Sequence, residues 1–120
     1  MTMIHAVVWT DHHSANIVQF DADAVVAKKV QEHTHNTPQH NSEVRSGHEF
    51  FGSVCDGLAG IKHVLVTGSH TATADFKHYV EKHKPQVATQ IVGYEVVDHQ
   101  TEGQLVAMAR TYFEKNARMN

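Results

Sequence analysis

The stretch that decides the fold is Met-Ile-His-Ala-Val-Val-Trp-Thr, at residues 3–10. Its apolar residues, at positions 4 and 6–9, fall on both alternations of an extended chain, so both faces of this strand need cover from water. A strand of this kind lies in the middle of a sheet whose two faces carry helices. The rest of the chain is therefore expected to supply neighbouring strands and helices for both faces.

Two more strands are expected over Ala15–Phe20 and Val25–Val30. Polar turns at residues 11–14 and 21–23 separate the three strands. Connections this short join antiparallel neighbours, because a parallel pair needs a long crossover. The first part of the chain therefore predicts an antiparallel meander.

The remainder alternates helices with strands. Apolar residues at helical spacing predict a first helix around Phe51 to Leu58, with Cys55 on its buried face and Gly60 as its stop. A short buried strand is expected at Val64–Val66. The next helix starts near Thr71 and ends at Pro85, because the residue before a proline disfavours the helical conformation. Its predicted core face consists of Ala72, Phe76, Tyr79, Val80 and His83.

A fifth strand over Ile91–Val97 leads into the last helix. Thr101 and Gln104 stand three residues apart at its start, the spacing of a capping box. Its predicted buried stripe consists of Leu105, Met108, Ala109, Tyr112 and Phe113.

The predicted order of elements is β-β-β-α-β-α-β-α. A meander followed by two right-handed crossovers gives a five-stranded mixed sheet in the order 3-2-1-4-5, with three helices distributed over its two faces. This is the topology of the RNase H-like fold. At 120 residues, the chain has room for a single domain over residues 1–120.

Composition narrows the function classes. No apolar run is long enough to span a membrane, and Cys55 is the one cysteine, which excludes a disulfide framework. We therefore expect a cytoplasmic protein without a membrane partner. The net charge of −3 argues against strong nonspecific binding to nucleic-acid phosphates, and the twelve histidines make that charge sensitive to pH just below neutrality.

Polar residues follow the three strands that would run parallel, where α/β sheets commonly bind ligands. Carboxylates and imidazoles gathered there hold a divalent metal or act as general acid and base. Ordinary turn and helix-cap chemistry explains the same residue types, and two strand-end carboxylates are too few for a two-metal nuclease. The candidate strand-end cluster is Asp11, His12, His13, Ser69, His70, Asp98 and His99.

The apolar pattern stops over residues 33–46, which predicts a flexible, histidine-rich loop. Structureless connections of this length are usually functional or disordered. His33, His35 and His40 are candidate ligands for zinc or another divalent metal, and a solvated loop is the alternative. The candidate binding loop consists of His33, His35, Gln39, His40, Arg45 and His48.

Three blocks, at residues 8–17, 67–76 and 91–105, resemble a bacterial family of small proteins labelled translational machinery proteins. That family is similar to the middle domain of the archaeal and eukaryotic peptide-chain release factor and of Pelota, which has an RNase H-like fold. The resemblance covers nearly the whole chain and is absent from the loop. Of the family's Gly-Pro-Gly turn after the fourth strand, this chain keeps only Gly68.

In the release factor, the loop between the third strand and the first helix carries a Gly-Gly-Gln motif that acts in peptide release. The corresponding loop here contains Pro38-Gln39 and no such motif, so peptide release does not carry over. Pelota also lacks the motif and works in ribosome rescue. The resemblance therefore implies a noncatalytic, ribosome-associated protein that contacts RNA or a ribosomal protein through residues 33–48 and requires no cofactor.

Two other functions stay open at this point. One is a metal-binding or metal-dependent hydrolytic domain that uses the loop or strand-end histidines. The other is a homodimeric interaction module with a pH-sensitive surface, since each imidazole titrates near neutrality.

The metal-binding alternative predicts that saturating zinc raises the melting temperature, because a ligand that binds only the folded state stabilises it by mass action. Alanine at both His33 and His35 removes the shift if the loop binds the metal. Alanine at both Asp11 and Asp98 removes it if the strand ends do. Calorimetric melting curves with and without zinc measure the effect, and an unchanged curve contradicts this alternative.

Overall fold

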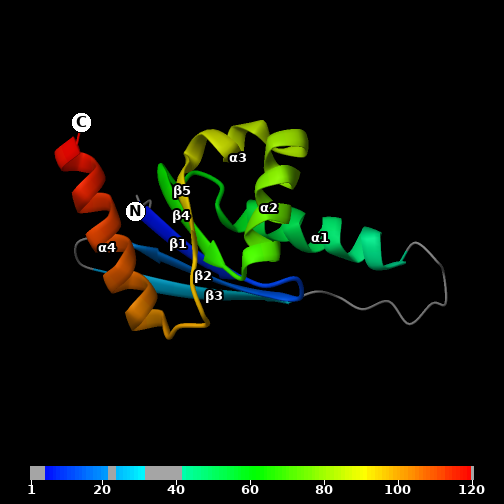
Figure 1. The fold of residues 1–120 in the computed structure, drawn as a ribbon, viewed down its shortest axis with the longest axis horizontal. Coiled ribbons are helices and arrows are strands. Elements are labelled where there is room, and N and C mark those ends of the chain that lie inside the picture. Colours follow the sequence, from blue (N-terminus) through cyan, green and yellow to red (C-terminus); the bar gives the residue numbers. More distant parts are fainter. Residues whose placement is uncertain (1–4, 22–23, 32–41, 120) are drawn as a thin grey trace.

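The computed structural model describes the chain at residues 5–21, 24–31 and 42–119 (Figure 1). Within these ranges the chain forms five strands and four helices. Their order is β1 (His5–Thr10), β2 (Ser14–Phe20), β3 (Val25–Gln31), α1 (Ser42–Gly57), β4 (His63–Gly68), α2 (His70–His83), α3 (Pro85–Gln90), β5 (Ile91–Val96) and α4 (Glu102–Met119).

The five strands form one sheet in the order β3-β2-β1-β4-β5, as predicted for the RNase H-like topology. β1 pairs antiparallel with β2 and parallel with β4, and β5 continues the parallel half of the sheet. β3 closes the antiparallel half by pairing with β2. β1 is therefore the central strand, as its apolar pattern indicates.

The two faces of β1 belong to two separate cores. Ala6 and Val8 pack on one face beneath α1, α2 and α3, together with Phe51 and Phe76. Val7 and Trp9 pack on the other face, together with Leu105 of α4. Figure 1 shows α4 on one side of the sheet and the other helices on the opposite side.

α1 begins earlier than its apolar pattern indicates. The sequence predicts a loop up to Ser46, whereas α1 starts at Ser42. Arg45 and His48 of the predicted binding loop therefore lie on a helix. Apolar spacing detects only the turns that pack on the sheet, beginning with Phe50 and Phe51. Once a helix has formed, each added residue gains a backbone hydrogen bond, so it extends past its buried part.

Pro85 does more than end a helix. α2 stops at His83, as expected, but Pro85 then occupies the first turn of α3, which makes four helices where three were predicted. Proline suits this position because its missing N–H has no intrahelical partner there. The prediction that His83 faces the core is also wrong, since its side chain is exposed and lies against the ring of Tyr79.

The start of α4 follows the sequence prediction. The Thr101 backbone N–H donates to Oε1 of Gln104 at 3.0 Å, and the Gln104 N–H donates to Oγ1 of Thr101 at 3.2 Å, which is a reciprocal capping box. Leu105 and Ala109 are fully buried, so the predicted stripe faces the sheet. Within the described ranges, no helix combines the length and apolar character needed to cross a membrane.

Gly68, at the end of β4, allows two strands to approach closely. Its φ of 151° lies outside the usual range for residues with a side chain, and a Cβ built there would collide with the carbonyl oxygen of Thr10. The next residue, Ser69, donates its N–H to that same oxygen at 3.3 Å. The glycine that matches the family turn is thus required by the packing of β4 against β1.

We expect Gly68→Ala to lower the free energy of unfolding by roughly 2–4 kcal/mol, because the substitution combines a strained backbone with a collision against β1. The matched control is Gly103→Ala in α4, where an added Cβ meets nothing within 4 Å. That variant should be as stable as the parent or up to about 1 kcal/mol more stable, since alanine favours a helix. Urea unfolding of both variants measures the difference, and equal effects would contradict this role of Gly68.

Candidate functional site

The sheet brings the predicted strand-end cluster to one edge. Thr10, Gly68 and Val96 lie side by side at the ends of β1, β4 and β5. Backbone hydrogen bonds continue past the strands, from Ser69 to Thr10 at 3.3 Å and from Val97 to Gly68 at 3.1 Å. The residues that follow these strands therefore share an edge, as the topology predicted.

Asp11 holds the turn between β1 and β2. Its Oδ1 accepts hydrogen bonds from the backbone N–H groups of His13 and Ser14, both at 2.7 Å. Burial alone raises the pKa of Asp11, but these hydrogen bonds outweigh burial and hold the pKa below its ordinary value. The carboxylate is thus engaged in its own turn.

The side chain of His12, in the same turn, contacts α2. Its Nε2 lies 2.9 Å from Oδ2 of Asp75, and both side chains are largely exposed. The predicted cluster omitted Asp75, which lies in the second turn of a helix and follows no strand. The sequence held one weak indication that Asp75 lies near this edge. The helix that carries it begins directly after β4, so its first turns lie close to the end of that strand.

His99 lies on the other face of the sheet. Its ring meets the Trp9 ring edge-on, with the centroids 4.8 Å apart. The indole N–H of Trp9 donates to the carbonyl oxygen of Val97 at 3.2 Å, so the linker after β5 is fixed to β1. His99 therefore supports the packing of this linker beside α4.

The edge thus divides its polar residues between two faces. His12 and Asp75 pair on the side of α2, whereas His99 packs on the side of α4. Ser69 precedes α2, but its side chain forms no capping hydrogen bond. His13, His70 and Asp98 are exposed. Among the described residues, no three or more His, Cys, Asp or Glu side chains are placed to hold one metal ion.

Of the predicted binding loop, the structure describes only the part from Ser42 onward. His33, His35, Gln39 and His40 lie outside the described residues, so the metal-ligand prediction for the loop stays a prediction. The backbone of Arg45 and His48 lies in the first half of α1. The segment in question leaves β3 after Gln31 and enters α1 at Ser42.

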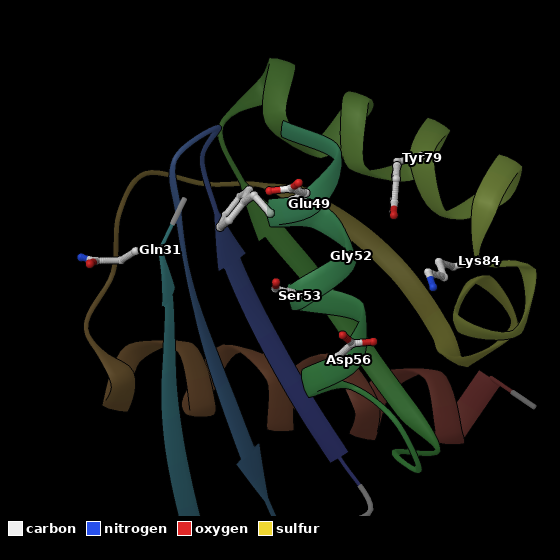
Figure 2. Close-up of a pocket in the computed structure, with 8 residues that line it drawn as sticks. Gln31, Glu49, Gly52, Ser53, Asp56, Tyr79 and Lys84 are labelled. Atoms are coloured by element: carbon white, nitrogen blue, oxygen red, sulfur yellow. The ribbon is translucent and has the colours of Figure 1, made fainter. Parts of the chain in front are cut away.

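A hollow of about 510 Å³ lies beside α1, lined by several polar side chains and by Phe50. Figure 2 shows Glu49, Gly52, Ser53 and Asp56 along this helix, with Tyr79 and Lys84 on one side of it and Gln31 on the other. Sequence reasoning missed this hollow, because these residues come from β3, α1, α2 and the link after α2, which are distant in the sequence. Carboxylate, hydroxyl, amide and ammonium groups together make it a surface for polar contacts.

Burial favours the neutral forms of Tyr79, which lines the hollow, and of Cys55, which is buried in α1. Burial raises the pKa of the Cys55 thiol to about 12, and burial likewise raises the pKa of Tyr79. A thiol with this pKa is almost wholly protonated near neutral pH, and the thiolate is the nucleophile. The hollow is therefore better suited to binding than to covalent chemistry through Cys55.

Comparisons with known proteins agree with the fold. No protein-family model matches the chain, and neither does any curated protein by sequence. Among solved structures, Pelota of Archaeoglobus fulgidus matches 99% of this chain with a TM-score of 0.65 and 16% identity. An archaeal translation termination factor matches 94% with a TM-score of 0.59, and Pelota of Thermoplasma acidophilum matches 84% with a TM-score of 0.58, both at 16% identity.

These matches cover only 35%, 39% and 30% of the three larger proteins. The chain therefore has the fold of one domain of a release factor or Pelota, which confirms the resemblance to their middle domain. At this level of identity the similarity concerns the fold.

We expect Asp11→Ala to lower the free energy of unfolding by about 1–2 kcal/mol at neutral pH, because two backbone N–H groups lose their acceptor. The matched control is Asp98→Ala, whose side chain is exposed after β5 and should change stability by less than about 0.5 kcal/mol.

The destabilisation by Asp11→Ala should depend on pH. Because folding lowers the pKa of Asp11, its stabilising effect is present above the ordinary carboxyl pKa of 3.8 and is lost as the pH falls through the lower, folded-state value. Unfolding curves of parent and variant should therefore converge in acid. A constant difference down to the lowest workable pH would show that the carboxylate charge is not involved.

Proposed function

We propose that this protein is a noncatalytic, translation-associated domain that contacts ribosomal RNA or a ribosomal protein through the loop and helix start at residues 33–48. The observation that carries this proposal is the fold similarity to Pelota and to an archaeal translation termination factor over nearly the whole chain. Fold similarity does not itself specify a function, so the proposal also depends on where residues 33–48 lie in the fold.

The position of this segment supports the proposal. It joins β3 to α1, the connection at which the release factor carries its functional tip. The segment has Pro38-Gln39 where that factor has Gly-Gly-Gln, which favours contact over peptide release. Connections of this length in compact domains are usually functional or disordered, and binding is one of the functions that they serve.

The adjoining surface also supports a contact role. The hollow begins at Gln31, at the end of β3, and continues over α1. It presents hydrogen-bond donors and acceptors that suit either RNA or a polar protein surface. Because the net charge is −3, binding should come from local polar contacts and fall only moderately as salt increases.

Co-sedimentation with ribosomes at moderate salt tests the proposal. The parent chain should enrich in the ribosomal fraction, and the triple variant His33→Ala, His35→Ala, Gln39→Ala should lose most of that enrichment because its contact side chains are gone. The matched control is His78→Ala, His83→Ala, Gln86→Ala, which removes the same residue types from the exposed surface of α2 and α3. The control should sediment like the parent.

Two outcomes would contradict the proposal. One is no enrichment of the parent chain in the ribosomal fraction. The other is equal enrichment of all three chains, which would assign the contact to a different surface. Thermal melting of each variant shows whether it is folded.

A further inference from the structure

The edge strand β3 is unusually open. Among the residues that the structure describes, it pairs with β2 on one side only, and of its seven residues only Val30 is not exposed. Two apolar side chains at its start are left in solvent, with Val25 50% exposed and Val26 46% exposed. Figure 1 shows β3 at the free edge of the sheet, and α4 packs on β1 and β2.

The register shows which backbone groups of β3 face outward. The Asp21 N–H donates to the Ala24 carbonyl at 3.0 Å, so residues 21 and 24 form a hydrogen-bonded pair. Hydrogen-bonded and non-hydrogen-bonded pairs alternate along an antiparallel ladder. From the observed register, Val25, Ala27, Lys29 and Gln31 occupy non-hydrogen-bonded pairs, and their N–H and C=O groups point away from β2.

The side chains of β3 give this edge a definite chemistry. Lys28 and Lys29 are exposed at its centre and alternate between the two faces of the sheet. Neither forms an ion pair within the described part of the chain. A second hollow, of about 400 Å³, lies beside the strand between Lys29, Gln31 and Ser53 of α1.

We propose that the free edge of β3 binds an extended, acidic segment of a partner protein as an additional strand. The outward N–H and C=O groups pair with the backbone of that segment, and its carboxylates lie near Lys28 and Lys29. Recognition by strand addition takes its affinity from such main-chain hydrogen bonds and its selectivity from neighbouring side-chain pockets. This surface does not include residues 33–48, although Gln31 and Ser53 also line the larger hollow beside α1. The peptide-binding test below does not involve the ribosome, so either proposal can fail without the other.

A second copy of this chain fits the same edge less well. The two-fold pairing that uses all four outward-facing residues joins Val25 to Gln31 and Ala27 to Lys29 of the other copy. Its axis then passes through Lys28 and places two Lys28 side chains directly opposite one another. Like charges in this position destabilise a strand pair. Carboxylates in a foreign strand avoid this repulsion.

A synthetic peptide tests the proposal. The probe is a fluorescent peptide of alternating valine and glutamate, about eight residues long, to match a typical strand. Fluorescence anisotropy with the full chain should show saturable binding. A probe of the same sequence with every second amide N-methylated keeps its charge but cannot pair along one edge, so it should bind roughly tenfold more weakly or worse.

Variants at Ala27 separate strand pairing from charge attraction. Ala27→Pro removes an outward N–H without removing a bond to β2, and edge strands tolerate proline in that orientation. It should weaken binding roughly tenfold or more, whereas the control Ala27→Val keeps the N–H and should bind like the parent. The pair Lys28→Glu, Lys29→Glu should also lose binding, because it repels the carboxylates.

Several results would overturn the proposal. Absence of saturable binding by the parent would show that the lysines only protect the edge from pairing, a common role of charged residues on edge strands. Equal binding of the N-methylated probe would reduce the interaction to charge attraction. A dimer of the parent that Ala27→Pro dissolves in light scattering would assign the edge to a second copy. If Ala27→Pro fails to fold, the N-methylated probe still decides the question on the parent chain.

Discussion

The burial of β1 on both faces is the constraint on which the rest of the structure depends. Alternate residues of one strand enter two different cores, with Val8 beneath α1 and α2, and Val7 beneath α4. A strand buried in this way needs a partner on each side, and it has antiparallel β2 and parallel β4. The parallel partner in turn requires a crossover, so the helices on one face follow from the pairing of β1.

The same central strand determines what the polar edge of the sheet can do. Successive side chains of a strand point to opposite faces of the sheet. Polar residues at the same edge can therefore lie on different faces, too far apart to contact one another. Here His12 pairs with Asp75 on one face, and His99 packs against Trp9 on the other. Asp11 stabilises its own turn through two backbone N–H groups. The edge therefore supports the fold through local contacts.

The surfaces that we propose for partners lie instead around β3 and α1. In the part of the chain that the structure describes, the outer edge of β3 is unpaired, and α1 borders a hollow that Gln31, Tyr79 and Lys84 also line. The proposed strand addition at β3 and the proposed contact through residues 33–48 would use neighbouring surfaces that meet at Gln31.

Sequence alone determined the strand order, the burial of β1 on both faces and the capping box at Thr101, because these follow from hydrophobic period, connection length and local hydrogen bonding. It also located the strand-end residues on one edge. Only the tertiary structure decided that α1 starts at Ser42, that Pro85 opens α3, and that His12 selects Asp75. Each of these depends on which surfaces meet in space: polar helical turns carry no apolar period, and a side chain's partner across 63 residues leaves no trace in local sequence.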